Sequence, residues 1–278
     1  MDGHDSTRKD GQLPPMLLSD RDRIPSLPDG TLESVTSELV RRLVRNRTSL
    51  EAGNGHHLEM PESADIAAFC DALTDPDATR SLAFFDSLTR AGKTVDTLAL
   101  RYIASAAELL GKRWERDECS FLEVTLGMAR LHGLQRSIRS GFAPARLNLD
   151  PELTALFTVT PGDTHVLGVT IAADFFRRAG WVVDLNTAPE IDRLLAMASL
   201  TSYSVVGVSV GAYPDDGRLE ETISRLRDLQ PGARLALGGH VDHLQPALLT
   251  RIRADVIVED VTTAPFSLQT MLISALKD

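Results

Sequence analysis

The sequence predicts an α/β protein in which a helical bundle precedes a doubly wound parallel sheet. Residues 62–142 show helical periodicity almost throughout, with breaks at Asp75-Pro76 and Gly92. Residues 152–278 alternate short aliphatic runs with amphipathic segments, which is typical of strands and helices that follow one another in a parallel sheet. We therefore expect a flexible tail over residues 1–28, a helical unit over 29–142 and a sheet domain over 152–278.

The helical unit begins with a predicted helix over residues 29–47, in which Leu32, Val35 and Leu39 share one apolar face. Further helices are expected over 63–73, 77–90, 95–116 and 120–139. The links between these four helices are short, which favours antiparallel packing in a four-helix bundle. Residues 141–151 contain two prolines and no period, and we interpret them as the linker to the sheet domain.

The sheet domain contains five short runs that are rich in β-branched and aliphatic residues. These predict strands near residues 155–160, 181–186, 205–210, 234–238 and 255–258, with a last helix over 267–276. Five parallel strands with helices on both faces form a sheet of flavodoxin type. Sheets of this kind bind ligands at the carboxyl ends of their strands, in the crevice where the strand order reverses.

Composition and charge exclude several classes of protein. The net charge of −10 argues against a chain that binds DNA by its own electrostatics. Cys70 and Cys119 lie far apart in sequence, so neither a disulfide framework nor a zinc site of paired cysteines is expected. No apolar run long enough for a membrane span occurs, and the first residues are charged. We therefore expect a cytoplasmic protein.

A short motif follows the first predicted strand. The residues Gly162-Asp163-Thr164-His165-Val166-Leu167-Gly168 form a D-x-H-x-x-G pattern between that strand and an amphipathic helix. Asp163 is close enough to His165 to fix the tautomer of its imidazole, which leaves the other ring nitrogen for a metal. Because a match this short arises by chance, a helix-capping role for His165 is an equal alternative on this motif alone.

Two further motifs lie downstream at defined intervals. Forty residues separate Gly168 from Ser209-Val210-Gly211, and twenty-six separate Gly211 from Gly238-Gly239. With this spacing the chain resembles the cobalamin-binding domains of methionine synthase, corrinoid methyl carriers and cobalamin photoreceptors. The resemblance implies cobalamin in its adenosyl, hydroxo or methyl form, with cobalt bound by His165 and with Asp163 as the partner of that imidazole. It also implies that Ser209, Gly238 and Gly239 line the pocket for the nucleotide tail. The remaining cofactor-binding residues implied by these motifs are Thr164, Val166, Leu167, Gly168, Val210 and Gly211.

The end of the third predicted bundle helix and the start of the fourth resemble the helical cap that precedes such domains. By this resemblance Trp114, Val124, Thr125 and Met128 would cover the upper face of the corrin, in a cap whose last helix also carries His132. Photoreceptors of the CarH type carry a Glu-His pair where this chain has Val124-Thr125. The cap stretch Ser120–Leu131 and the run Val166-Leu167-Gly168-Val169 look most like the AerR/PpaA regulators of photosynthesis genes.

This resemblance implies a non-enzymatic, light-responsive antirepressor that binds a DNA-binding repressor of the CrtJ/PpsR type. The acidic charge suits such a basic partner, and the sequence is compatible with a homo-oligomer. The alternative is a corrinoid methyl carrier that serves two methyltransferases. Neighbouring genes for methyltransferases would favour the carrier, and genes for bacteriochlorophyll or carotenoid synthesis would favour the regulator.

One cluster remains outside these motifs. His240-Val241-Asp242-His243 follows the glycine pair directly. The two histidines of this cluster suggest zinc, but a third and a fourth ligand at a plausible spacing are not evident from the sequence. We therefore interpret this segment as the start of a helix near the tail pocket.

Overall fold

The computed structural model describes residues 60–141, 152–188 and 190–275. The predicted tail, the helix over 29–47 and nearly all of the linker lie outside these ranges. The first described unit is a bundle of helices whose bounds agree closely with the predicted ones. They are α2 (Ser63–Thr74), α3 (Ala78–Arg90), the π-helix η2 (Thr97–Ile103), α4 (Ala104–Glu115) and α5 (Phe121–Gly141).

The third predicted helix therefore consists of two parts, a π-helical start and an α-helical end. Thr94 caps the start, because its hydroxyl accepts a hydrogen bond from the Thr97 amide at 3.1 Å. Leu98 and Tyr102 of η2 are almost fully buried. Their spacing fits a π-helix as well as an α-helix, so the sequence pattern alone could not reveal the difference.

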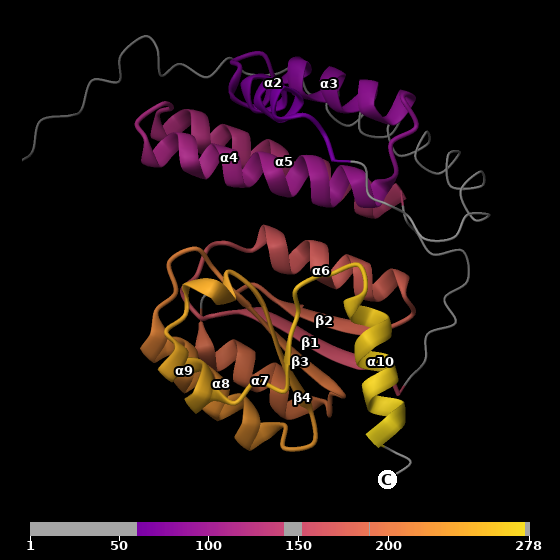
Figure 1. Ribbon diagram of the computed structural model, residues 1–278, viewed down its shortest axis with the longest axis vertical. Helices are drawn as coiled ribbons and strands as arrows, with labels where there is room; N and C mark the ends of the chain where they lie inside the picture. The colour runs from indigo at the N-terminus through magenta and orange to yellow at the C-terminus, as the bar shows by residue number, and fades with distance from the viewer. Residues whose placement is uncertain (1–59, 142–151, 189, 276–278) are drawn as a thin grey trace, which may run out of the picture.

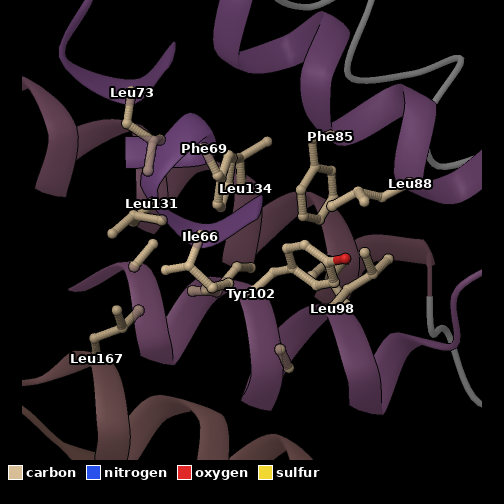
Figure 2. Close-up of a cluster of buried hydrophobic side chains, with 14 of the residues drawn as sticks. Ile66, Phe69, Leu73, Phe85, Leu88, Leu98, Tyr102, Leu131, Leu134 and Leu167 are labelled. Carbon is tan, nitrogen blue, oxygen red and sulfur yellow. The ribbon is translucent and has the colours of Figure 1, made fainter. Parts of the chain in front are cut away.

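The bundle is held together by a cluster of aromatic and aliphatic side chains (Figure 2). Phe69 lies near its centre, with its ring centroid 5.1 Å from that of Phe84 and 6.4 Å from that of Tyr102. Gly127 lets α5 approach α4 closely, because a Cβ there would lie 2.8 Å from Leu110 Cδ1. None of the helices in the described ranges combines the length and the apolar character needed to cross a membrane.

The second unit is a five-stranded, fully parallel sheet with the order β2-β1-β3-β4-β5. This order confirms the predicted flavodoxin-like fold. Its elements are β1 (Thr154–Val159), α6 (Leu167–Arg178), β2 (Val182–Asn186), α7 (Ile191–Leu200), β3 (Val205–Val210), α8 (Asp216–Leu229), β4 (Arg234–Gly239), the 3-10 helix η3 (Val241–His243), α9 (Pro246–Ile252), β5 (Val256–Ile257) and α10 (Ala264–Ala275).

The last helix begins three residues earlier than predicted. The Asp260 carbonyl accepts a hydrogen bond from the Ala264 amide at 3.1 Å, and the Asp260 carboxylate accepts one from the Thr262 amide at 2.8 Å. Pro265 is then tolerated in the first turn, where its missing amide hydrogen costs no hydrogen bond. These local contacts explain the earlier start.

Helices cover both faces of the sheet, and the bundle lies above one of them (Figure 1). One face packs against α6 and α10, and the other against α7, α8 and α9. The bundle contacts α6 through Leu167, Ile171 and Phe175, which are 6%, 2% and 7% exposed and belong to the bundle's own apolar cluster. Figure 2 shows Leu167 pointing toward this cluster. The helix that follows the D-x-H-x-x-G motif thus joins the two units.

Candidate functional site

Asp163 and His165 form a pair on the loop between β1 and α6. The Asp163 carboxylate oxygen Oδ1 lies 2.6 Å from His165 Nδ1 and accepts a hydrogen bond from the His165 backbone amide at 2.8 Å. The aspartate side chain is only 13% exposed, whereas the imidazole is 57% exposed. Because Nδ1 is engaged by the carboxylate, Nε2 is the nitrogen left for a metal.

Gly211, directly after β3, is what allows Asp163 to occupy this position. A Cβ on Gly211 would lie 2.2 Å from Asp163 Oδ2, far inside van der Waals contact. The parallel pairing of β1 with β3 brings the ends of the two strands together, since Val159 is in register with Ser209. The glycine of the second motif therefore makes room for the aspartate of the first.

The sheet surface beside this loop is lined by small residues. Residues alternate between the two faces of a strand, and Val205 and Ala236 belong to the core that α6 and α10 cover. Gly207, Ser209 and Gly238 have the same parity as these residues and therefore face the same side. Ser209 and Gly238 are also paired across β3 and β4. Together they leave a strip of the sheet with few side-chain atoms at its carboxyl half.

The neighbours of this strip show how close the packing is. The Phe157 ring lies over Gly207, where an added Cβ would be 2.6 Å from Phe157 Cδ1. Val258 lies on the other side, with its Cβ 3.7 Å from the Cβ position of Gly238. Val258 also borders a hollow of about 250 Å³ between the end of β5 and α10. Neither Gly238 nor Gly239 lines this hollow, which is formed by β5, the loop after it and the start of α10.

Gly239 has a backbone conformation that other residues rarely adopt. Its φ is +81°, and a Cβ would lie 2.4 Å from the Val210 carbonyl oxygen and 3.3 Å from Ser209 Oγ. Both the backbone angle and the close approach therefore require glycine. The two glycines therefore have different roles. Gly238 leaves the face of the sheet without a side chain, and Gly239 allows the left-handed turn of the backbone.

The structure does not bring every predicted residue to this place. Leu167 is buried against the bundle, and Val210 is buried in the core on the opposite face of the sheet. Thr164 is exposed on the loop, Val166 is half-buried, and Gly168 lies exposed in the first turn of α6. The side chains of Leu167 and Val210 therefore serve packing, and only their backbone is available to a ligand.

The predicted cap residues lie at one end of the bundle. Trp114 is 49% exposed near the end of α4. On α5, Val124 is half-buried and Thr125 is exposed, with its hydroxyl donating a hydrogen bond to the Phe121 carbonyl at 2.7 Å. Met128 packs partly against the bundle core. Burial lowers the pKa of His132, one turn further along, which favours its neutral form.

A contact between exposed side chains joins this end of the bundle to the sheet. The Tyr213 hydroxyl, on the loop after β3, donates a hydrogen bond to the Glu115 carboxylate at the end of α4. This bond also raises the pKa of Tyr213. The end of α4 therefore lies beside the loop that follows the carboxyl end of β3.

Sequence reasoning missed two exposed aromatic side chains, one in this contact and one at the start of α5. Tyr213 is 70% exposed and Phe121, at the start of α5, is 76% exposed. A signal for Tyr213 was available, because it lies two residues after Gly211, on a loop that follows the carboxyl end of a parallel strand. Phe121 had no such signal, since an apolar residue at the start of an amphipathic helix normally packs in the core.

Comparison with known proteins identifies the sheet domain. Residues 153–267 match the family model of the B12 binding domain. A protein of Rhodobacter capsulatus, described as an uncharacterized 20.5 kDa protein in the bchF-crtJ intergenic region, is 28% identical over 179 residues, which are 64% of this chain and 93% of that protein. The match confirms the resemblance to cobalamin-binding domains.

Solved structures agree on the fold. The monomethylamine corrinoid protein of Methanosarcina barkeri superposes with a TM-score of 0.59 at 15% identity, over 76% of this chain and all of that one. The likeness shows the fold, which residues 153–267 share with the B12 binding domain that they match. The observed residues fit that ligand, because an exposed imidazole held by a carboxylate stands beside a strip of small residues on the sheet.

Proposed function

We propose that this protein is a cobalamin-binding, light-responsive antirepressor that acts through a DNA-binding repressor of the CrtJ/PpsR type. The observation that carries the proposal is the Asp163–His165 pair beside the small-residue strip, in a domain that binds cobalamin. His165 would hold cobalt from below through Nε2, and Asp163 would fix the orientation of its ring. Ser209, Gly238 and Gly239 would border the nucleotide tail.

The regulatory part of the proposal is supported by the Rhodobacter capsulatus relative. Its gene lies in the bchF-crtJ intergenic region, and therefore next to crtJ. This position favours the regulator over a methyl carrier, whose partner methyltransferases would be expected as neighbours. The net charge of −10 suits a basic partner and disfavours direct binding to DNA.

The helical cap would respond to a change at cobalt by altering the protein surface that the repressor contacts. Bound cobalamin would supply a cobalt centre whose bonding changes on illumination. Trp114 and Phe121 stand exposed at the end of the bundle where the bond between Glu115 and Tyr213 joins it to the loop after β3. These side chains can repack when the group above His165 changes, and such repacking would create or hide the surface for the repressor.

The test measures binding of the purified repressor to the full chain, loaded with adenosylcobalamin, in the dark and after illumination. We expect the absorption spectrum and the affinity for the repressor to change together on illumination. In His165→Ala both changes should disappear, whereas Thr250→Ala, an exposed substitution on α9, should behave as the wild type.

Two results would overturn the proposal. One is repressor binding that is equal with and without cobalamin and in light and dark. The other is an unchanged light response in His165→Ala. Transfer of a methyl group to the chain by a methyltransferase, without any affinity for the repressor, would establish the carrier instead.

A further inference from the structure

The turn after β4 is firmly attached to the sheet. The His240 amide donates a hydrogen bond to the Val210 carbonyl at 3.0 Å, directly after the left-handed turn at Gly239. Val241 and Leu244 are 8% and 5% exposed and belong to the core beneath α8 and α9. Because these two apolar anchors point inward, the polar residues between and beside them face solvent.

The 3-10 geometry of η3 brings two imidazoles together. A 3-10 helix has three residues per turn, so residues i and i+3 lie on the same side. The rings of His240 and His243 are accordingly stacked, with centroids 4.9 Å apart and planes at 27°. Asp242 Oδ2 lies 4.0 Å from His243 Nε2. One ligand atom from each of the three residues lies within 4.8 Å of the others.

The hydrogen bond of His243 prepares its other nitrogen for a metal. Nδ1 lies 2.7 Å from the Ala212 carbonyl oxygen, which can only accept, so Nδ1 carries the proton. Nε2 therefore presents a lone pair. An imidazole that ligates a metal through one nitrogen while donating to a carbonyl through the other is the usual arrangement in metal sites.

We propose that His240, Asp242 and His243 bind a divalent metal ion of the zinc type. Two imidazoles and one carboxylate are ligands that Zn²⁺ prefers, at bonds of about 2.0–2.2 Å. All three side chains are exposed, so rotation of the His240 and Asp242 side chains can bring their ligand atoms to that distance around an ion bound at His243 Nε2. A fourth position stays open to water. His165 is not one of the three proposed ligands, and the proposal does not depend on the proposed regulatory function.

The test is a calorimetric titration of Zn²⁺ into the full chain after removal of metals with a chelator. We expect one saturable site of micromolar affinity or better. His240→Ala and His243→Ala should each weaken binding at least tenfold, and Asp242→Asn should weaken it less. The controls are Thr250→Ala, an exposed substitution on α9, and the double substitution His56→Ala with His57→Ala. Both should leave the affinity unchanged.

Circular dichroism of each variant checks that it folds. Two results would overturn the site. The first is no saturable binding of Zn²⁺. The second is binding that survives His240→Ala and His243→Ala but is lost in one of the controls, because the ion would then lie elsewhere.

Discussion

The bundle meets the sheet domain in two places of opposite character. Along α6 the contact is apolar and sealed, with Ile171 only 2% exposed. At the carboxyl ends of the strands the contact is polar and open, with Tyr213 70% exposed and bonded to Glu115. The contact along α6 is buried like the core of a domain, whereas the contact between Tyr213 and Glu115 is a hydrogen bond between exposed side chains.

Polar contacts reinforce the sealed contact at its edges. Asp174 on α6 accepts a hydrogen bond from Gln135 at 3.1 Å and pairs with Arg139 at 3.3 Å, both on α5. Arg178 pairs with Asp96 at the start of η2. The difference teaches that α6 anchors the bundle through buried apolar side chains, whereas the bond between Glu115 and Tyr213 at the strand ends joins two exposed side chains.

The largest expected effect is a loss of stability on substitution in the apolar contact along α6. Ile171→Ala removes a buried side chain from the contact between α6 and the bundle. Such a truncation leaves a cavity and should lower the free energy of unfolding by about 2–5 kcal/mol. Chemical denaturation followed by circular dichroism measures it. Tyr213→Ala at the open contact is the control and should stay near the wild-type value; equal losses in both variants would show that the two contacts do not differ.

The next largest effect is a loss of affinity for cobalamin, while the apolar contact along α6 stays unchanged. In Gly211→Ala the new Cβ would lie 2.2 Å from Asp163 Oδ2, so the carboxylate must move away from His165. Loss of such a partner typically weakens metal binding about 10–100-fold. Absorption titration with hydroxocobalamin measures the affinity, and Asp163→Asn should show a loss of the same order.

The control for this effect is another glycine substitution. A Cβ on Gly133, in the middle of α5, would meet nothing within 4 Å. Gly133→Ala should therefore leave the affinity for cobalamin unchanged and stabilise the helix by about 0.5–1 kcal/mol. Wild-type affinity in Gly211→Ala would show that the orientation of His165 does not depend on Asp163.

The smallest effect concerns the open contact alone. The hydrogen bond to Glu115 raises the pKa of Tyr213, so the contact contributes below the ordinary pKa of tyrosine and is lost as the pH rises through the raised value. Ultraviolet difference titration of the wild type against Tyr213→Phe isolates this hydroxyl. Burial raises the pKa of Tyr203 to about 12, which separates its titration. In Glu115→Ala the pKa of Tyr213 should fall, and an unchanged value would show that the contact does not form.

The sequence by itself determined the fold. Its strands and bundle helices agree with the structure to within a few residues, because hydrophobic periodicity reports directly which face of an element is buried. It also determined the chemistry of the Asp163–His165 pair, since two residues of separation on one loop bring the groups into contact. The motif also contains the glycine pair, and Gly239 adopts a left-handed backbone conformation that glycine allows.

Only the tertiary structure decided which distant residues meet. The roles of Gly211 beside Asp163, Tyr213 beside Glu115, and Ala212 beside His243 depend on how parallel strands bring their carboxyl ends to one edge. The π-helical start of the third helix and the stacking of His240 on His243 were equally invisible in the sequence. Hydrophobic periodicity indicates which face of one helix or strand is buried. Contacts between elements depend on strand register and on backbone turns, and these are determined jointly by residues far apart in the chain.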